Sequence, residues 1–348
     1  MSADKDKLDQ KSGGCTISVI MPAYNASSLL PEVLKPLIQL KEAGKVSEVI
    51  VVDDQSQDET AKLAREMGAD VLVTPQNGGP GAARNFAAEK AVGDVLWFVD
   101  SDVIAFAVGA DRLSDAFSDP GLGAVFGSYD DSPGSDGWFS KYKNLLHHYH
   151  HQQGRRDATT FWAGCGAVRA SVFHAVGGFD IHTYEVPSIE DIELGYRISD
   201  AGHRIEIDPG LLCKHLKHWT IINAVHTDIF RRALPWARLM IERNTVTNDL
   251  NASNAERARA VLAAVFFVSL LFLIVQPGTW PFAFGMTILI FAANWRLFRL
   301  FRRAGGLPMA VASMVYHQFY YVYSAGVFVW CLFEFHVLGK KDRVGVYK

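Results

Sequence analysis

Residues Val95–Val103 have the sequence VLWFVDSDV, an apolar run that ends in two aspartates, Asp100 and Asp102, with one residue between them. Such a run predicts a buried parallel strand, and open α/β sheets bind ligands at the carboxyl ends of their strands. Two carboxylates this close repel each other unless a cation or hydrogen-bond donors hold them. The pair therefore indicates a site for Mg²⁺ or Mn²⁺ bridging to a phosphate-bearing substrate. The alternative is that Asp102 caps the next helix and Asp100 is solvated at a strand end.

Strand and helix patterns alternate on the N-terminal side of this stretch. Alternation of this kind predicts a parallel sheet with right-handed helical crossovers, a nucleotide-binding type of α/β fold. The expected strands are residues 16–21, 48–52, 70–74 and 95–99. The expected helices are residues 31–43, 59–67 and 82–91.

A glycine cluster, Gly78-Gly79-Pro80-Gly81, follows the third expected strand and opens a helix. It approaches the dinucleotide fingerprint, but that motif follows the first strand and needs backbone freedom where Pro80 stands. We therefore exclude a dehydrogenase. The cluster instead predicts a flexible loop and a helix N-terminus that can face a diphosphate.

The charge balance is nearly neutral, at −3, and no basic tract occurs in the first half of the chain. These features exclude a nucleic-acid partner. Residues 1–14 are polar and lack an apolar core, so they predict a disordered lead-in rather than a secretory signal.

Two uncharged apolar runs, Val261–Val275 and Trp280–Trp295, are separated by a short segment that contains Pro277 and Gly278. With their flanks, both runs approach the roughly 20 residues that span a bilayer, which predicts a transmembrane hairpin. The alternative is a buried helical pair in a soluble core. Four arginines follow the second run and, by the positive-inside rule, place the N-terminal region in the cytoplasm: Arg296, Arg299, Arg302 and Arg303.

A third apolar region, Met309–Leu338, is followed by Lys340, Lys341 and Arg343. A single crossing would put this basic tail outside, against the positive-inside rule. A re-entrant or interface-lying segment would keep it inside, and we favour that interpretation. Residues 221–239 mix apolar side chains with arginines, as an interfacial amphipathic helix does.

Six motifs occur in order within residues 16–215. They are Val19–Asn25 (VIMPAYN), Val52–Thr60 (VDDQSQDET), Gly81–Asn85 (GAARN), Asp100–Asp102 (DSD), Gly177–Asp180 (GGFD) and Glu190–Arg197 (EDIELGYR). With these motifs the chain resembles the inverting family 2 glycosyltransferases of the GT-A fold, in their membrane-anchored bacterial form. The resemblance implies an α/β fold with a mostly parallel sheet flanked by helices, followed by C-terminal membrane helices.

The resemblance implies a donor site for a nucleotide-diphospho-sugar. Pro22, Tyr24 and Asp54 would hold the base, with Tyr24 stacking on it and Asp54 accepting hydrogen bonds from a uracil or similar ring. Arg84 would approach the base and the diphosphate. Gln55 stands where the family usually has glycine in a turn. We expect this departure to have little effect, because φ need not be positive there.

The resemblance also implies the catalytic groups. Asp100 would contact ribose or metal, Asp102 would ligate the metal, and Asp191 would be the general base, with Glu190 beside it. Sugar transfer needs the departing phosphate charge neutralised and a base for the acceptor's proton, which agrees with these roles. The alternative for Asp191 is an ordinary helix cap. Trp162 is expected either to stack on a sugar in the acceptor pocket or to pack in the core.

Basic and histidine side chains near the membrane region suggest further contacts. We expect His215 to complete the metal sphere or touch the diphosphate. Arg231 or Arg232 would neutralise the leaving group or contact lipid headgroups. His147 and His151 lie four apart on an expected helix. They could share a metal, but an amphipathic helix near the membrane surface is the favoured interpretation.

These observations predict five segments: a lead-in at 1–14, a catalytic domain at 15–215, interfacial amphipathic helices at 216–258, a membrane region at 259–338 with its hairpin at about 260–296, and a basic tail at 339–348. We expect a multi-pass glycosyltransferase of the inner (cytoplasmic) membrane, with its catalytic domain in the cytoplasm. It would transfer a sugar to a lipid or membrane-delivered hydroxyl acceptor. The alternatives are a polyprenyl-phosphate glycosyltransferase and an inactive nucleotide-sugar-binding scaffold.

Overall fold

The computed structural model describes residues 15–245, 248 and 250–339. The predicted lead-in, and the tail beyond residue 339, lie outside the described residues. The chain forms two compact units. The sheet unit contains the described residues up to 126, with 161–179 and 194–206, and the helical unit contains residues 127–160, 180–193 and those from 207 onward. The division falls inside strands β6 and β9 and inside helix α7.

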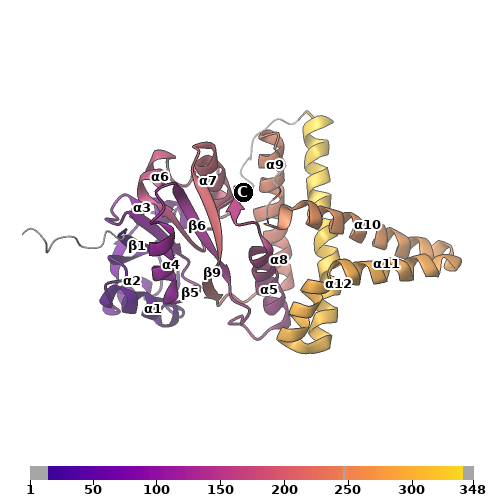
Figure 1. Cartoon of the computed structure of the whole chain (residues 1–348), viewed down its shortest axis with the longest axis horizontal. Helices are drawn as coiled ribbons and strands as arrows, with labels where there is room; N and C mark the ends of the chain where they lie inside the picture. Colours follow the sequence, from indigo (N-terminus) through magenta and orange to yellow (C-terminus); the bar gives the residue numbers. More distant parts are fainter. Residues whose placement is uncertain (1–14, 246–247, 249, 340–348) are drawn as a thin grey trace, which may run out of the picture. The chain divides into compact units, whose positions relative to one another are not determined.

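The sheet unit is built on parallel strands, as the alternating pattern predicts (Figure 1). Neighbouring strands follow the order β3-β2-β1-β4-β8-β6, in which β3, β2, β1 and β4 are parallel and β8 runs antiparallel to both β4 and β6. The bounds are β1 Ile17–Ala23, β2 Glu48–Asp53, β3 Asp70–Val73, β4 Val95–Val99, β6 Leu122–Tyr129 and β8 Cys165–Arg169. A short strand, β5 (Val103–Ala105), follows the two aspartates.

Helices connect the parallel strands of this unit. Helix α1 shows why they form: its buried side chains recur at helical spacing and face the sheet, as in an amphipathic crossover helix. The bounds are α1 Leu30–Glu42, α2 Thr60–Glu66, α3 Gly79–Ala88, α4 Val108–Ala116 and α6 Ala170–Ala175. The expected strands and helices of the N-terminal half are therefore confirmed, with small shifts at their ends.

The helical unit has a core in which α5 packs against α12, through side chains such as Tyr142, Leu145, Phe301 and Met314. A continuous helical stretch covers the predicted amphipathic segment and changes to a π-helix, η1, in the middle. The bounds are α5 Trp138–Gln153, β7 Asp157–Ala158, α8 Ile221–His226, η1 Thr227–Ala233, α9 Leu234–Glu242, η2 Leu250–Ala252, α10 Asn254–Val275, η3 Pro277–Thr279, α11 Trp280–Ala293 and α12 Trp295–His336. Helix α7 (Glu190–Asp200) and strand β9 (Arg204–His215) run through the division between the units.

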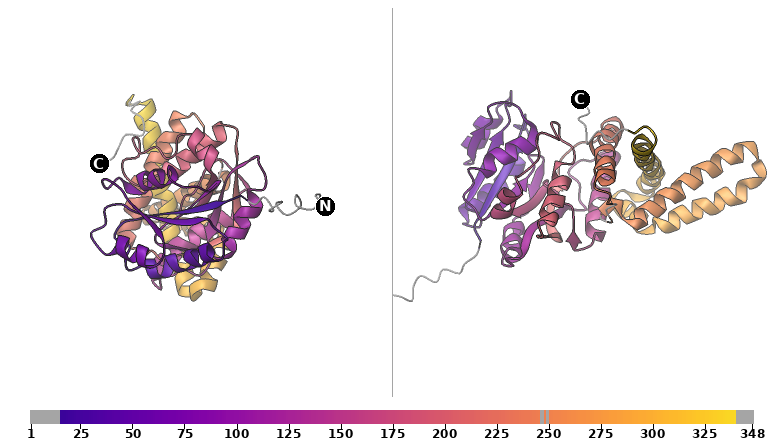
Figure 2. Two further views of the ribbon diagram at one scale, coloured as in Figure 1. Left: turned by 90° about the vertical axis from the view of Figure 1, so that its left-hand side faces the viewer. Right: turned by 90° about the horizontal axis from the view of Figure 1, so that it is seen from above.

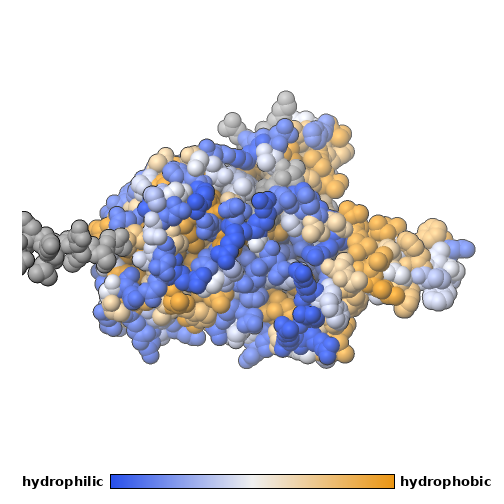
Figure 3. Space-filling view, viewed as in Figure 1, coloured by the Kyte–Doolittle hydropathy of each residue, from blue (hydrophilic) through white to orange (hydrophobic). Residues whose placement is uncertain are grey.

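The two apolar runs form a helical hairpin, and whether it crosses a membrane stays a prediction. Helices α10 and α11 lie side by side, joined by a tight 3₁₀ turn, η3 (Figures 1 and 2). Their surface is largely apolar (Figure 3). Among the described residues, α10 alone is long and apolar enough to cross a bilayer by itself, with a mean hydropathy of 2.6. The segment Pro277–Ala293 meets this condition only together with α12, as a pair bent by 73°.

Helix α12 changes direction near its start. Gly305 and Gly306 have non-helical dihedrals, with φ of +74° at Gly306, and Pro308 follows. This break separates the arginine-rich first turns from a helix that contains most of the third apolar region and ends at His336. The expectation that this region re-enters a membrane or lies at its interface stays a prediction.

Candidate active site

Asp54 follows β2 directly and organises the glycine loop. Its carboxylate accepts hydrogen bonds from the Thr74 hydroxyl (2.8 Å) and from the backbone N–H groups of Gly78 (3.1 Å) and Gly79 (2.7 Å). Only 3 % of the residue is exposed. The carboxylate thus satisfies the free amides at the start of α3. The amides that were expected to contact a diphosphate at this helix end are bonded to the Asp54 carboxylate instead. Contact of Asp54 with a nucleotide base stays a prediction.

The expectation for Gln55 is wrong, because its φ is +67°. The turn after β2 uses the left-handed conformation that glycine adopts at little cost. The side-chain amide of Gln55 donates a hydrogen bond to the Thr74 carbonyl, which helps to hold the residue there. This carbonyl lies 19 residues away along the chain. The side chain therefore offsets part of a backbone strain that glycine would avoid.

Arg84 and Asp100 form an ion pair at the carboxyl end of β4. Arg84 is 4 % exposed and comes from α3, while the Asp100 side chain is about one-third exposed. The Arg84 guanidinium also lies 5.4 Å from the centre of the Phe179 ring, in cation–π geometry. The Asp100 backbone N–H donates to the Gly164 carbonyl at 3.1 Å. The structure thus places two of the predicted donor-site residues in direct contact.

Asn85, next to Arg84, ties α3 to the GGFD motif. Its side-chain amide donates to the Phe179 carbonyl (2.8 Å) and accepts from the Phe179 N–H (2.9 Å). Gly178 has φ of +67°, and a Cβ at this position would lie 2.6 Å from the Asn85 side-chain oxygen. The glycine is needed for this close approach, which fixes the helix that carries Arg84. Asn85 belongs to the GAARN motif, but the sequence does not indicate this contact.

Pro22 and Tyr24 lie at the carboxyl end of β1. Pro22 is buried opposite Val52 of β2, and pairing of β1 with β4 stops at Ile20, so the missing N–H of Pro22 breaks no ladder bond to β4. Tyr24 is 50 % exposed and follows the strand directly. An exposed aromatic ring at this edge can stack on a base.

Asp102 lies in the turn between β4 and β5 and is half-buried. Among the described residues, no three His, Cys, Asp or Glu side chains gather closely enough to hold a metal ion by themselves. The donor set of Asp100 and Asp102 still fits Mg²⁺ or Mn²⁺. Both ions prefer carboxylate oxygens, and Mg²⁺ is commonly bound by one or two carboxylates together with water and substrate phosphates.

Trp162 is half-buried and packs close to the segment that bonds Asp100. A Cβ on Gly164 would lie 2.6 Å from the Trp162 indole, so the glycine makes room for the ring. This close packing gives Trp162 a structural role beside the Asp100 loop. Contact with a sugar stays a prediction.

Glu190 and Asp191 begin helix α7 and belong to the helical unit. The Ser188 N–H donates to the Glu190 carboxylate at 2.7 Å, and the Ser188 hydroxyl donates to the Arg231 carbonyl at 2.9 Å. The Ile192 N–H donates to Asp191 Oδ1 at 2.8 Å. The positive end of the helix dipole favours the charged carboxylate of Asp191. Both the predicted base and the predicted cap are compatible with this geometry.

His215 is buried at the end of β9. Its Nδ1 lies 2.7 Å from the Asn144 side-chain oxygen, and its ring stacks on Tyr129 with 4.4 Å between centroids. The rings of His147 and His151 lie against each other at 3.8 Å. Burial lowers the pKa of both, to about 3 for His151. The rings of His147 and His151 pack inside the unit on this face of α5, and a position of the helix near a membrane surface stays a prediction.

Arg231 and Arg232 lie on the π-helix η1, a rare conformation that often marks functional segments. Asp228 on the same turn is buried and holds Lys143 of α5, with Nζ 2.6 and 2.9 Å from its two oxygens. The sequence motifs did not indicate this pair. Lys143 lies on the same face of α5 as Phe139, so a lysine within that apolar stripe is a signal for a buried partner.

The sheet order, with polar loops at the carboxyl ends of β1, β2 and β4, is that of the GT-A fold. The solved mannosyltransferase PcManGT of Pyrobaculum calidifontis, determined in complex with GDP-Man and Mn²⁺, is similar to this chain. Its TM-score is 0.53 at 20% sequence identity, and the match covers 92% of this chain and 88% of that one. At this identity the likeness concerns the fold.

Residues 18–177 match the family described as Glycosyl transferase family 2. Residues 18–177 therefore form a family 2 glycosyltransferase domain, and the named relatives support a transferase enzyme. It is 25% identical over 268 residues to the O-antigen chain rhamnosyltransferase RfbN of Salmonella typhimurium, covering 72% of this chain and 81% of that protein. It is 43% identical over 105 residues to the 4,4'-diaponeurosporenoate glycosyltransferase of Staphylococcus haemolyticus, covering 28% of this chain and 27% of that protein.

Proposed function

We propose that this protein transfers a sugar, with inversion, from a nucleotide-diphosphate sugar to a hydroxyl group of a lipid or membrane-delivered acceptor. The Arg84–Asp100 ion pair carries the proposal, because it puts a buried cation at the carboxyl end of β4. That cation lies on the helix whose first amides Asp54 organises. Ligand sites of open α/β sheets lie at this edge.

The donor would be held by residues of the sheet unit. Tyr24 would stack on the base, and Pro22 would shape the floor beneath it. Arg84 would attract the diphosphate through a guanidinium that is already fixed by Asp100 and Phe179. Asp102, with Asp100, would hold Mg²⁺ or Mn²⁺. The bound ion would neutralise the negative charge that builds up on the diphosphate as it leaves the sugar.

The acceptor hydroxyl would attack the anomeric carbon while the bond to the diphosphate breaks. Its proton would pass to Asp191, and the nucleoside diphosphate would leave with the bonding electron pair. A single displacement of this kind inverts the anomeric centre. The proposed base rests on the EDIELGYR motif and on a carboxylate at the N-terminus of α7.

The apolar surface of the helical unit supports a membrane-delivered acceptor. Side chains along α10 and α11, including Val268, Leu271 and Phe284, are more than half exposed. Apolar surface of this extent is favourable in a bilayer or at an interface. We infer that the protein lies in the inner membrane with its catalytic residues on the cytoplasmic side, where the arginines that follow α11 would also lie.

A transfer assay tests the proposal. The full chain in membranes is incubated with a panel of nucleotide sugars, Mn²⁺ and a lipid extract, and products are identified by mass spectrometry. We expect one donor to yield a glycosylated lipid. Asp191→Asn should lower turnover by about 100-fold or more, since general base catalysis contributes that much, and Glu193→Gln on the same helix is the matched control.

Two outcomes would contradict the assignment. If Asp191→Asn retained its turnover with a polyprenyl phosphate, Asp191 would not be the general base. A phosphate acceptor is already an anion and needs no base to remove a proton. Binding of a nucleotide sugar without transfer to any acceptor would instead indicate the inactive nucleotide-sugar-binding scaffold.

A further inference from the structure

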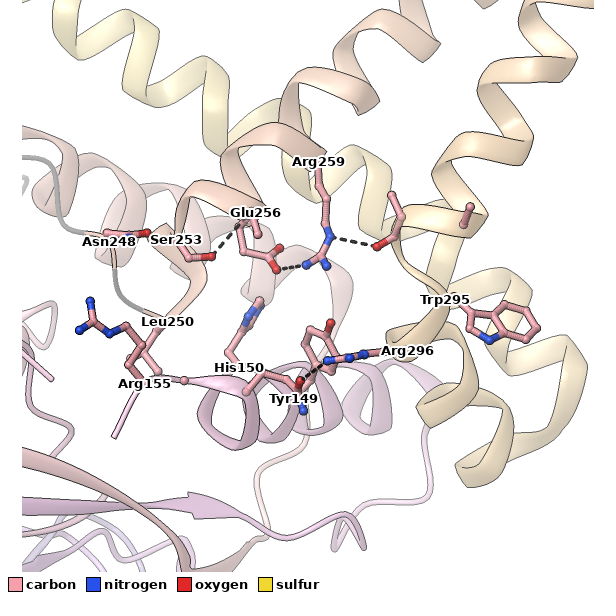
Figure 4. Close-up of a pocket in the computed structure, with 15 residues that line it drawn as sticks. Tyr149, His150, Arg155, Asn248, Leu250, Ser253, Glu256, Arg259, Trp295 and Arg296 are labelled. Carbon is pink, nitrogen blue, oxygen red and sulfur yellow. Dashed lines mark hydrogen bonds and ion pairs between the residues drawn. The ribbon is translucent and has the colours of Figure 1, made fainter. Parts of the chain in front are cut away.

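A cavity of about 470 Å³ lies in the helical unit, and none of its lining residues has been assigned above to the donor or the acceptor (Figure 4). It is formed where the C-terminal end of α5 meets the first turns of α10 and the junction of α11 with α12. The lining residues used below are Tyr149, His150, Arg155, Arg259, Trp295 and Arg296.

Positive charge predominates in the lining. Among the described residues, the lining contains three arginines, Arg155, Arg259 and Arg296, and one carboxylate, Glu256, which is ion-paired with Arg259. Arg296 donates a hydrogen bond to the Gln153 side-chain oxygen at 3.0 Å, a neutral partner that leaves its charge uncompensated. The site therefore has an excess of guanidinium groups, whose planar donors match phosphate oxygens.

His150 provides an independent sign of a ligand. Its side chain lines the cavity, the residue is only 8 % exposed, and its Nε2 has no hydrogen-bond partner in the part of the chain that the structure describes. A buried polar nitrogen without a partner is costly. Burial lowers the pKa of His150, so the ring is neutral and can donate one hydrogen bond from Nε2. An anionic oxygen in the cavity would accept it.

The location of the cavity indicates where that oxygen comes from. The N-terminal end of α10 and the C-terminal end of α11 both line the cavity. The cavity therefore lies at the base of the apolar hairpin (Figure 4). Trp295 lines it and is about half exposed. Tryptophan is enriched where a protein meets lipid headgroups. We propose that this cavity binds the phosphate of an anionic lipid headgroup through Arg155, Arg296 and His150.

This proposal is independent of sugar transfer, and a direct binding measurement tests it. Dihexanoyl phosphatidic acid is titrated into the full chain in detergent by calorimetry, beside dihexanoyl phosphatidylcholine and inorganic phosphate. We expect saturable binding of the phosphatidic acid. Arg155→Gln and Arg296→Gln should each weaken it about ten-fold, because each loses a charge-assisted hydrogen bond. Arg302→Gln, an exposed arginine of α12 outside the cavity, should leave it unchanged.

His150→Phe gives a second test. It keeps a ring of similar shape and removes the donor, so it should weaken binding while the thermal midpoint is retained. Absence of saturable binding, or an equal loss in Arg302→Gln, would overturn the proposal. Inorganic phosphate bound as tightly as the lipid would assign the site to free phosphate. Equally tight phosphatidylcholine would show that the site does not select an anionic headgroup. Both results contradict the proposal. Loss of sugar transfer with intact lipid binding would concern the proposed function alone.

Discussion

At the scale of single residues, two adjacent glycines both have a positive φ, but only one of them also lies close to another side chain. Gly177 and Gly178 both have positive φ, at +84° and +67°. A Cβ on Gly177 meets nothing within 4 Å, whereas one on Gly178 meets the Asn85 side-chain oxygen. The second position therefore controls the link between α3 and the GGFD loop.

Gly178→Ala should cost more stability than Gly177→Ala. Each substitution places alanine at a positive φ, which costs about 1 kcal/mol of stability. Gly178→Ala also displaces the Asn85 side chain. We expect the free energy of unfolding, measured by urea titration, to fall by about 1–2 kcal/mol more for Gly178→Ala. Equal losses would show that the Asn85 contact contributes nothing.

Gln55 allows a related test of its turn. Gln55→Ala keeps the positive φ and loses the bond to the Thr74 carbonyl, while Gln55→Gly loses the bond and relieves the strain. We expect the glycine variant to be more stable than the alanine variant by about 1 kcal/mol. A more stable alanine variant, measured by the same titration, would contradict the left-handed turn.

At the scale of elements, a buried ion pair joins three helical segments. Asp228 on η1 accepts from Lys143 of α5 and from the Tyr323 hydroxyl of α12, at 2.9 Å for the latter. Burial lowers the pKa of Lys143 and the charge of Asp228 opposes this shift. The π-helix that carries Arg231 and Arg232 is thereby anchored to the core of the unit.

Lys143→Met should destabilise the helical unit strongly. Removing one partner leaves Asp228 charged and buried, which costs about 3–5 kcal/mol. The double variant Lys143→Met/Asp228→Leu should recover much of that loss, because no buried charge remains. Arg204→Met, which breaks an exposed ion pair with Asp119, is the control and should cost at most about 1 kcal/mol. A double variant no more stable than Lys143→Met would contradict the account.

At the scale of the whole molecule, the buried histidines predict how stability changes with pH. The pKa of His151 falls from 6.5 to about 3 because the ring is buried, and the Gly127 carbonyl, 2.7 Å from its Nδ1, opposes this shift only in part. Between these values the unfolded chain binds a proton that the folded chain refuses. Stability is therefore full above pH 6.5 and falls as the pH drops towards 3, by about 1.4 kcal/mol per pH unit for each such histidine.

Thermal midpoints measured from pH 7.5 to 4.5 check this expectation. His151→Gln should flatten the decline, and His174→Gln, which changes an exposed histidine, should not. An identical slope in both variants would show that His151 is not the group that titrates.

Local patterns predicted much of the fold. Apolar periodicity located the strands and helices of the N-terminal half, and two uncharged apolar runs located the α10–α11 hairpin, since these features depend on neighbouring residues. Contacts between distant residues were not predictable. The bond from Gln55 to Thr74 stabilises an unexpected φ, and the Lys143–Asp228 pair joins positions 85 residues apart. Of the candidate site, the motifs indicated Arg84 and Asp100, but not that they pair with each other.

The central claim is that the sheet unit binds a nucleotide-diphospho-sugar through Arg84 and the two aspartates. The most direct measurement is calorimetric titration of uridine, guanosine and deoxythymidine diphospho-sugars with Mn²⁺ into the full chain. We predict that one of them binds, and that Asp102→Asn and Arg84→Gln each weaken it about ten-fold or more, whereas the exposed control Arg65→Gln does not. Absence of binding by every donor, or unchanged affinity in both site variants with thermal midpoints retained, would contradict the account.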